Sequence, residues 1–198
     1  LTSEAERRAR LEGVHAALDR AESLVFLDTE STGGRNGRLI EVALVETDVE
    51  QNITGGLHFR CNPHRRSQAR ARRVHGIQDC ELEHCPEFAA RANELLEAVR
   101  GKTVVIHDRT MDLLWLNREL QATRPGAPRF EDCCTVIDSF VLARAVPSER
   151  RRNGLDALLE WYGLGARGGH HDAYGDAALL SRVFFELWWD LDEWLYGE

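Results

Sequence analysis

The sequence predicts an α/β fold in which a mixed sheet of five strands is covered by helices. In the N-terminal third, apolar runs rich in β-branched residues are joined by turns with glycine or asparagine, which is typical of hairpins. Beyond residue 86, short apolar runs alternate with segments of helical periodicity, which is typical of strands connected by helices. The 198 residues, 43% of them hydrophobic, are enough for one domain with a core.

Each element is expected from its local pattern. Residues 3–21 carry apolar side chains on one face, which predicts an N-terminal helix within residues 1–23, ahead of the main domain over residues 24–198. Strands are expected at residues 24–28, 39–47, 56–61, 103–107 and shortly after 128. A loop is expected at 61–73, and further helices at 86–100, 110–122, before 145, at 153–162 and at 173–195. The last helix combines an apolar stripe with several aromatic residues, which favours packing against the core, with a partner surface as the alternative.

The length of the apolar stretches and the cysteine content indicate where the protein is located and which metal sites it could form. No apolar stretch approaches the roughly 18 residues that a membrane span requires. The five cysteines are irregularly spaced, which favours a reducing, cytoplasmic location. Cys80, His84 and Cys85 offer a weaker metal cluster, because a tetrahedral structural site needs a second ligand pair.

The basic residues are almost all arginine, although the net charge is −8. Lys102 is the single lysine, six arginines fall between residues 60 and 73, and three more occupy 150–152. Guanidinium groups suit phosphate, so these clusters indicate either a local nucleic-acid footprint or a solvated surface.

Carboxylates stand at the ends of several expected elements. Asp28 and Glu30 are two residues apart at the end of a strand and therefore point to one face. A divalent cation would offset their repulsion, whereas a capped turn is the alternative. Asp112 would lie in a first helical turn, and His171 precedes Asp176 by five positions at the start of the last helix. Each of these is common in structural roles, and the set is more informative than any member.

Five motifs occur in order: DTESTG at 28–33, VHGI at 74–77, HDRTMD at 107–112, NGLDAL at 153–158 and HDAYGDA at 171–177. Together they resemble the DEDD superfamily of 3′–5′ exonucleases, in its histidine-containing, DnaQ-like subgroup. Within it they are most similar to the proofreading epsilon subunits of bacterial replicative DNA polymerase III.

The resemblance implies a ribonuclease H-like fold and two Mg²⁺ or Mn²⁺ ions per active site. Asp28 would bridge both ions, Glu30 and Asp176 would complete one site, and Asp112 would serve the second. His171, rather than the histidine before it, would take the proton from the attacking water. The implied reaction releases nucleoside 5′-monophosphates from 3′ ends of single-stranded nucleic acid, with DNA favoured, in proofreading or repair.

Substrate contacts are expected from the first motif, the VHGI motif and the arginine cluster. The residues are Thr29, Ser31, Thr32, His75, Arg65, Arg66 and Arg70. A polymerase or other protein partner is left open, and no membrane partner is expected. The alternatives are an exoribonuclease of the same superfamily, or a low-activity nucleic-acid-binding or scaffolding module.

Two positions depart from the second motif of the family. Asp108 replaces the usual Asn, and Met111 replaces Phe. Met keeps apolar bulk, whereas Asp108 could weaken substrate binding, join the metal ligands or face solvent. Neither change removes an expected metal ligand, so we expect an active enzyme.

Overall fold

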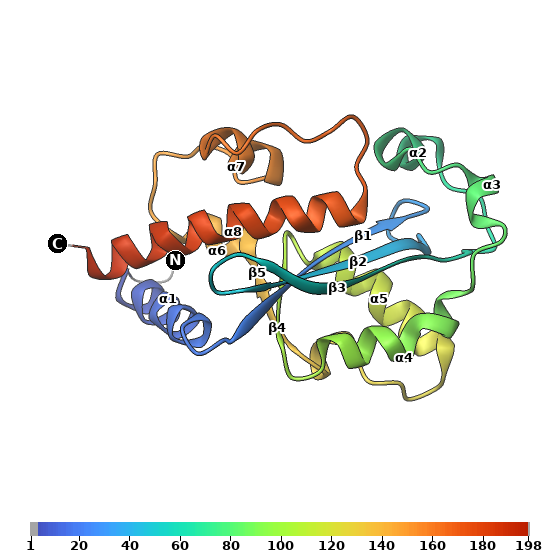
Figure 1. Cartoon of the computed structure of the whole chain (residues 1–198), viewed down its shortest axis with the longest axis horizontal. Coiled ribbons are helices and arrows are strands. Elements are labelled where there is room, and N and C mark those ends of the chain that lie inside the picture. The colour runs from blue at the N-terminus through green and yellow to red at the C-terminus, as the bar shows by residue number, and fades with distance from the viewer. Residues whose placement is uncertain (1–3, 198) are drawn as a thin grey trace.

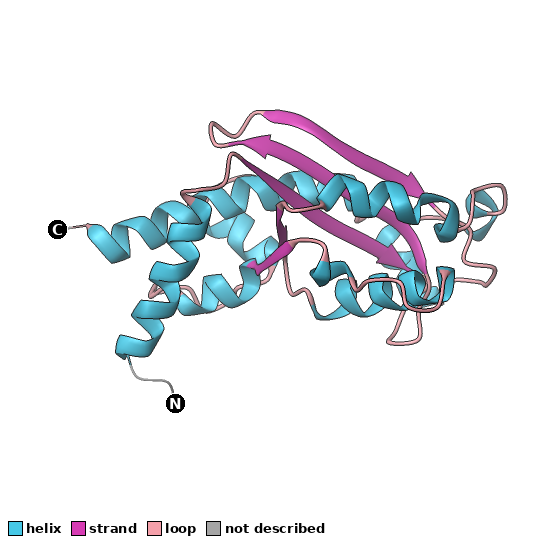
Figure 2. Cartoon of the chain, turned by 90° about the horizontal axis from the view of Figure 1, so that it is seen from below, coloured by secondary structure: helices cyan, strands magenta, loops and turns pink. Residues whose placement is uncertain are grey.

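The computed structural model describes residues 4–197, which form one five-stranded sheet with helices on both faces (Figures 1 and 2). In chain order the elements are α1 (Glu4–Leu18), β1 (Ser23–Ser31), β2 (Leu39–Asp48), β3 (Ile53–Arg60), α2 (Ala69–His75), α3 (Asp79–Leu82), α4 (Phe88–Val99), β4 (Thr103–Ile106), α5 (Thr110–Thr123), the 3-10 helix η1 (Phe130–Asp132), β5 (Thr135–Asp138), α6 (Ser139–Ala145), α7 (Leu155–Trp161) and α8 (Ala173–Tyr196).

The sheet is mixed, in the order β3-β2-β1-β4-β5. β2 runs antiparallel to both β1 and β3, whereas β4 runs parallel to both β1 and β5. The mixed five-stranded sheet flanked by helices is therefore confirmed. Because β1 and β4 are parallel, their carboxyl ends meet at the same edge of the sheet.

β1 is the central strand and is buried on both faces. Leu24 and Phe26 pack into the cluster that includes α1, α6, α7 and α8, whereas Val25 and Leu27 pack into the cluster that includes α4 and α5. This alternation is the two-residue period of an extended chain. It also fixes which way the polar residues at the end of β1 point.

β1 extends further than the sequence pattern indicated. The strand was expected to end at Asp28, but its backbone pairs with β2 as far as Ser31, with a register shift after Glu30. The apolar run ends earlier than the hydrogen-bonded ladder, because pairing uses the backbone and tolerates polar side chains at an edge of the core. As a result Asp28 and Glu30 both lie in extended chain.

Other boundaries also differ from the expected ones. Part of the loop expected at 61–73 is the helix α2, because alanine and arginine have high helix propensity. Pro86 lies outside α4, whose N-cap is Glu87. α1 ends at Leu18 rather than at residue 21, and the expected start at residue 3 lies outside the described residues.

The long C-terminal helix α8 packs against both β1 and the N-terminal helix α1, as expected for a core helix. Phe184 on α8 meets Phe26 on β1 edge to face, with ring centroids 5.7 Å apart. Trp194 lies beneath the guanidinium groups of Arg7 and Arg8 on α1. Trp189, in contrast, is 56% exposed.

Arg150 fits neither interpretation of the arginine cluster at 150–152, which was a nucleic-acid footprint or a solvated surface. Its side chain is 1% exposed, and its Nη1 lies 2.9 Å from Oδ2 of Asp190 on α8. It also contacts the Tyr162 hydroxyl. Arg150 therefore forms an ion pair instead of the solvated surface or phosphate contact that three adjacent arginines suggest. The sequence does not indicate this pair, because Asp190 is 40 residues away.

Within residues 4–197, no helix combines the length and apolar character needed to cross a membrane. All five cysteines carry free thiols.

The Phe26–Phe184 contact predicts a large loss of stability when it is removed. Phe184→Ala leaves a cavity between α8 and β1 and should lower the free energy of unfolding by about 3–5 kcal/mol. Trp189→Ala, on the exposed side of the same helix, should lower it by less than about 1 kcal/mol. Urea unfolding followed by circular dichroism measures both. Equal losses for the two variants would show that the face of α8 is assigned wrongly.

Candidate active site

A cavity of about 260 Å³ lies beyond the carboxyl ends of β1 and β4. Its walls come from β1, α5, α8, the end of α2, the start of α7 and the segments that precede α5 and α8. The lining residues are Asp28, Thr29, Glu30, Val74, His107, Asp112, Trp115, Leu155, Arg167, His171 and Asp176.

The structure brings all five predicted catalytic side chains to this cavity. Asp28 and Glu30 come from β1, and Asp112 from the first turn of α5. Asp176 lies in the first turn of α8, and His171 lies in the segment just before that helix. Residues up to 148 positions apart, counted from Asp28 to Asp176, therefore share one cavity.

Hydrogen bonds from the sheet hold two of the acids in place. The Thr29 hydroxyl donates to Oδ1 of Asp112 at 2.6 Å, which ties α5 to β1. Glu41, fully buried on β2, accepts from the backbone N–H of Ala173 at 3.0 Å and so fixes the start of α8, where Asp176 lies. The second oxygen of Glu41 accepts from Arg60 at 2.8 Å, so this buried carboxylate is paired. Sequence patterns did not single out Glu41.

Burial and the charges of neighbouring acids raise the pKa values of all four site acids. For Asp28, burial, followed by the charges of Asp112 and Glu30, raises the pKa well above its usual value. Burial and the neighbouring Asp176 raise the pKa of Glu30 to about 8. Burial also raises the pKa of Asp112 and of Asp176 to about 6 each. Carboxylates with such raised pKa values are typical of functional sites that await a cation.

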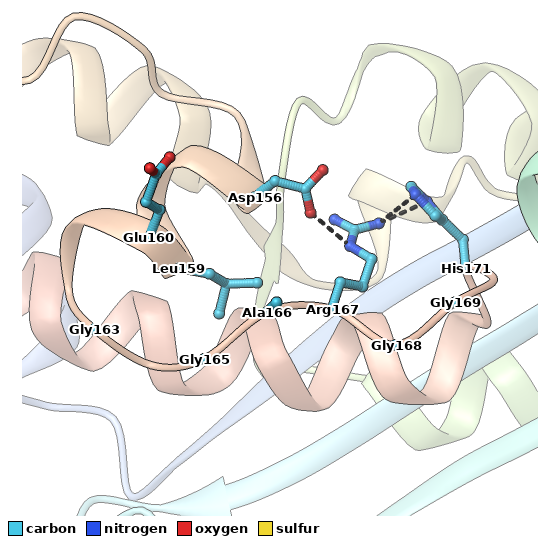
Figure 3. A pocket seen from close by; sticks show the side chains of 10 residues that line it. All are labelled: Asp156, Leu159, Glu160, Gly163, Gly165, Ala166, Arg167, Gly168, Gly169 and His171. Carbon is cyan, nitrogen blue, oxygen red and sulfur yellow. Dashed lines mark hydrogen bonds and ion pairs between the residues drawn. The ribbon is translucent and has the colours of Figure 1, made fainter.

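Arg167 is the cation that sequence analysis missed (Figure 3). Its Nη1 lies 2.6 Å from Oδ2 of Asp176 and 2.6 Å from Nδ1 of His171. Its Nε lies 2.9 Å from Oδ1 of Asp156, and its side chain is 13% exposed. The only signal in the sequence was an arginine within a glycine-rich segment just before the last motif, which by itself indicates nothing.

His171 is placed as a neutral imidazole. Burial, and then the charge of Arg167, lowers the pKa of His171 below its usual value. Its backbone N–H donates to the carbonyl of Val74 at 3.0 Å, which joins the segment before α8 to the last turn of α2. The neighbouring His170 is exposed and does not line the cavity.

Three ligand atoms in the described part of the chain lie within 4.8 Å of one another, from Glu30, His171 and Asp176. Two carboxylates and an imidazole suit a divalent cation, so the residues present fit the expected metal. No second cluster of three such ligands occurs among residues 4–197, so the weaker alternative at Cys80, His84 and Cys85 is not brought together.

Only some of the residues expected to bind substrate line the cavity. Thr29 lines the cavity, but the Ser31 hydroxyl accepts from Gly33 N–H, and the Thr32 hydroxyl from Arg38 N–H, inside the following turn. The buried His75 ring accepts from the backbone N–H of Ile77 and does not line the cavity. The structure therefore does not bring the side chains of Ser31, Thr32 and His75 to the site.

The predicted arginines lie on the surface around α2. Arg66 and Arg70 are exposed, and Arg65, also exposed, donates to the carbonyl of Asn36 at 3.0 Å. None of the three lines the cavity, to which α2 contributes Val74.

His107 and Trp115 line the cavity although neither was predicted as a site residue. His107 Nδ1 lies 2.9 Å from the Ser139 hydroxyl, whereas its buried Nε2 has no hydrogen-bond partner among residues 4–197. His107 begins the second motif, so that motif was the signal that could have identified it.

Asp108 faces solvent and does not line the cavity. Its φ of +57° lies in the left-handed region, which Asn and Asp adopt more readily than other residues. The exchange of Asn for Asp therefore preserves the backbone, while its charge contributes to the raised pKa of Asp112.

Comparison with known proteins agrees with this geometry. The family model described as "Exonuclease" matches residues 25–184. DNA polymerase III subunit epsilon of Rickettsia typhi is 33% identical over 169 residues, covering 82% of this chain and 72% of the relative. The subunit from Escherichia coli K12 is 32% identical over 172 residues, covering 82% of this chain and 70% of the relative.

Solved structures share the fold at lower identity. Apo exonuclease I superposes with a TM-score of 0.66 at 20% identity, over 88% of this chain but 42% of that protein. A 3′-exonuclease that recognises the histone mRNA stem-loop superposes with a TM-score of 0.69 at 16% identity, over 86% of this chain and 83% of that protein. This chain thus spans about four-tenths of exonuclease I and most of the second protein.

The fold and the cavity together define a ribonuclease H-like protein with an acidic candidate active site. With the family match and the relatives above, the chain belongs to the exonuclease family, in its DnaQ-like DEDD branch.

The raised pKa of Glu30 predicts a pH-dependent stability in the absence of metal. Folded Glu30 keeps its proton up to about pH 8, whereas in the unfolded chain its pKa is the ordinary value of 4.5. Its contribution is therefore fully present below pH 4.5 and is lost as pH rises towards 8. In EDTA, Glu30→Gln should match the wild-type melting temperature near pH 5 and exceed it by a few degrees near pH 8.

Glu50→Gln provides the control, because Glu50 is exposed in the turn between β2 and β3. Its melting temperature should follow the wild type at every pH. Parallel curves for Glu30→Gln and the wild type would contradict the assigned environment of Glu30.

Proposed function

We propose that this protein is a metal-dependent 3′–5′ exonuclease that acts on single-stranded DNA, in proofreading or repair, and releases nucleoside 5′-monophosphates. The observation that carries the proposal is the convergence of Asp28, Glu30, Asp112, His171 and Asp176 on one cavity. Membership of the exonuclease family supplies the reaction class.

The four carboxylates are the proposed metal ligands. Two ions of magnesium or manganese, held by Asp28, Glu30, Asp112 and Asp176, would supply an activated water and offset the charge of the scissile phosphate. The donor set supports this assignment, since carboxylate oxygens are preferred by these ions.

His171 is the proposed general base. An imidazole whose pKa is lowered by burial is neutral near pH 7 and therefore has a free lone pair for the proton of the attacking water. The Val74 carbonyl and the Asp172 cap of α8, which accepts from Gly175 N–H at 2.8 Å, hold the backbone on either side of this ring.

The substrate strand would lie against apolar and basic parts of the cavity rim. Val74, Trp115 and Leu155 line the cavity and offer surfaces for a sugar or a base. Arg65, Arg66 and Arg70 would hold the phosphate backbone near α2.

The relatives suggest a partner and two candidate substrates for such an enzyme. The epsilon subunits suggest a polymerase partner, and exonuclease I has been solved with single-stranded DNA. The free cysteines fit the proposed cytoplasmic location. The histone mRNA 3′-exonuclease favours RNA as the second candidate substrate, because its fold covers nearly the same part of this chain.

Degradation of matched oligonucleotides tests the function. With 5′-labelled DNA and RNA of one sequence, and Mg²⁺ or Mn²⁺, we expect DNA to shorten stepwise from its 3′ end. His171→Ala should slow this by roughly 10²- to 10⁴-fold, the usual contribution of a general base. His170→Ala, at the exposed neighbouring position, should stay within about twofold of the wild type.

The other outcomes of this assay are equally informative. Shortening of RNA alone would establish the exoribonuclease instead. No metal-dependent shortening of either strand, with Asp28→Ala indistinguishable from the wild type, would leave a binding or scaffolding module.

We expect the arginines around α2 to make substrate binding depend on salt concentration. In an Asp28→Ala background, which prevents cleavage, replacing Arg65, Arg66 and Arg70 with alanine should weaken binding of single-stranded DNA. Because each phosphate contact contributes about 0.7 to the slope of log K against log salt, the slope should fall by about 2. Fluorescence anisotropy at several salt concentrations measures both quantities.

The matched control removes the same charge elsewhere. Arg10, Arg20 and Arg152 are exposed and lie outside the cavity. Their triple alanine variant should keep the wild-type slope. If the two triple variants behave alike, the arginines around α2 have no specific role.

A further inference from the structure

Arg167 lies where a divalent cation would have to bind. Its Nη1 is 2.6 Å from Oδ2 of Asp176 and 2.6 Å from Nδ1 of His171, and both residues belong to the group of three with metal-ligand spacing. Among the described residues that line the cavity, Arg167 is the only arginine or lysine. A guanidinium group stays charged at all accessible pH values, so it is a permanent cation within the acid cluster.

The contacts of Arg167 exclude a metal ion from the same atoms. Asp176 is one of the proposed metal ligands, and Nη1 of Arg167 already contacts its Oδ2 at 2.6 Å, within the group of three residues that have metal-ligand spacing. Two positive charges within about 4 Å of each other would also repel. Occupation by Arg167 and occupation by a metal ion are therefore mutually exclusive.

The structure also provides a place for the displaced side chain. Arg167 borders a second cavity, of about 700 Å³, between α7 and the segment before α8 (Figure 3). Asp156, whose side chain is 72% exposed, already contacts Nε of Arg167 from this side at 2.9 Å. Glu160 also lines this cavity but is paired with Arg152 at 3.2 Å, so Asp156 is the carboxylate that would receive the guanidinium.

The backbone around Arg167 is open enough to allow this movement. Gly163, Gly165, Gly168 and Gly169 flank the arginine, and a side chain at any of them would meet open space. The cavity beside these glycines leaves room on the α7 side of Arg167.

We propose that Arg167 is a built-in inhibitory cation, which occupies Asp176 and His171 in the metal-free protein and competes directly with the divalent ion. This inference rests on the proposed function, and it adds that metal binding must first displace the guanidinium. The guanidinium also contacts Nδ1 of His171 at 2.6 Å, so it must leave before the proposed base can use that atom.

Calorimetric titration of Mn²⁺ into the full chain, without nucleic acid, tests the inference. Arg167→Met removes the competing charge and should lower the Mn²⁺ dissociation constant by about fivefold or more, the usual size of a coupling between two sites. Arg167→Lys keeps a cation and should remain closer to the wild type. Arg20→Met, an exposed position with the same change in net charge, should leave the constant unchanged.

Thermal unfolding in EDTA and in Mn²⁺ supplies a second measurement. The metal-free Arg167→Met protein should melt below the wild type, because its acids lack a counterion, and Mn²⁺ should raise its melting temperature more. If Arg167→Met does not fold, Arg167→Gln, which is also neutral and polar, should show the same changes.

The possible failures are distinguishable. Equal or weaker Mn²⁺ binding by the Arg167 variants would overturn the inference and leave the proposed function intact, because Arg167 would then organise the ligands rather than compete. A wild-type protein that binds no Mn²⁺ at millimolar concentration would overturn both.

Discussion

Repulsion among four carboxylates at the end of β1 is the constraint on which the site depends. Asp28 and Glu30 share one face of an extended strand, and Asp112 and Asp176 approach them from helices on opposite faces of the sheet. Burial strengthens every charge interaction between them. Such a cluster persists only if it holds protons, a fixed cation or a metal ion, and the raised pKa values and Arg167 supply the first two.

The core is arranged so that this repulsion cannot spread the acids apart. β1 is packed on both faces, Thr29 binds Asp112, and Glu41 holds the first turn of α8 to β2. Glu41 is itself a buried carboxylate close to the cluster, but Arg60 neutralises it. These anchors hold the acids in a geometry that their mutual repulsion would otherwise oppose. This is expected where an active site is preorganised.

Spacing alone left Asp28 and Glu30 open to a capped turn, and the set of acids that the structure brings to one cavity was assigned from the resemblance of the five motifs. The sequence did not indicate the roles of Arg167 or Arg150, whose partners are set by tertiary contacts: Asp190 is 40 positions from Arg150. Arg167 was not singled out and Arg150 stood in a cluster expected to be solvated or to bind phosphate, yet their side chains are 13% and 1% exposed. α2 was missed since its arginine-rich pattern lacks the apolar period that usually marks a helix.

A protein with a net charge of −8 and an acidic cavity must still attract a polyanion. Under the proposed function, long-range attraction has to come from local positive charge, which the exposed arginines around α2 would provide. The same helix ends at Val74, whose carbonyl binds the backbone of His171 and whose side chain lines the cavity. A strand held by α2 would consequently lie beside the imidazole, so the element that attracts the substrate also positions the proposed base.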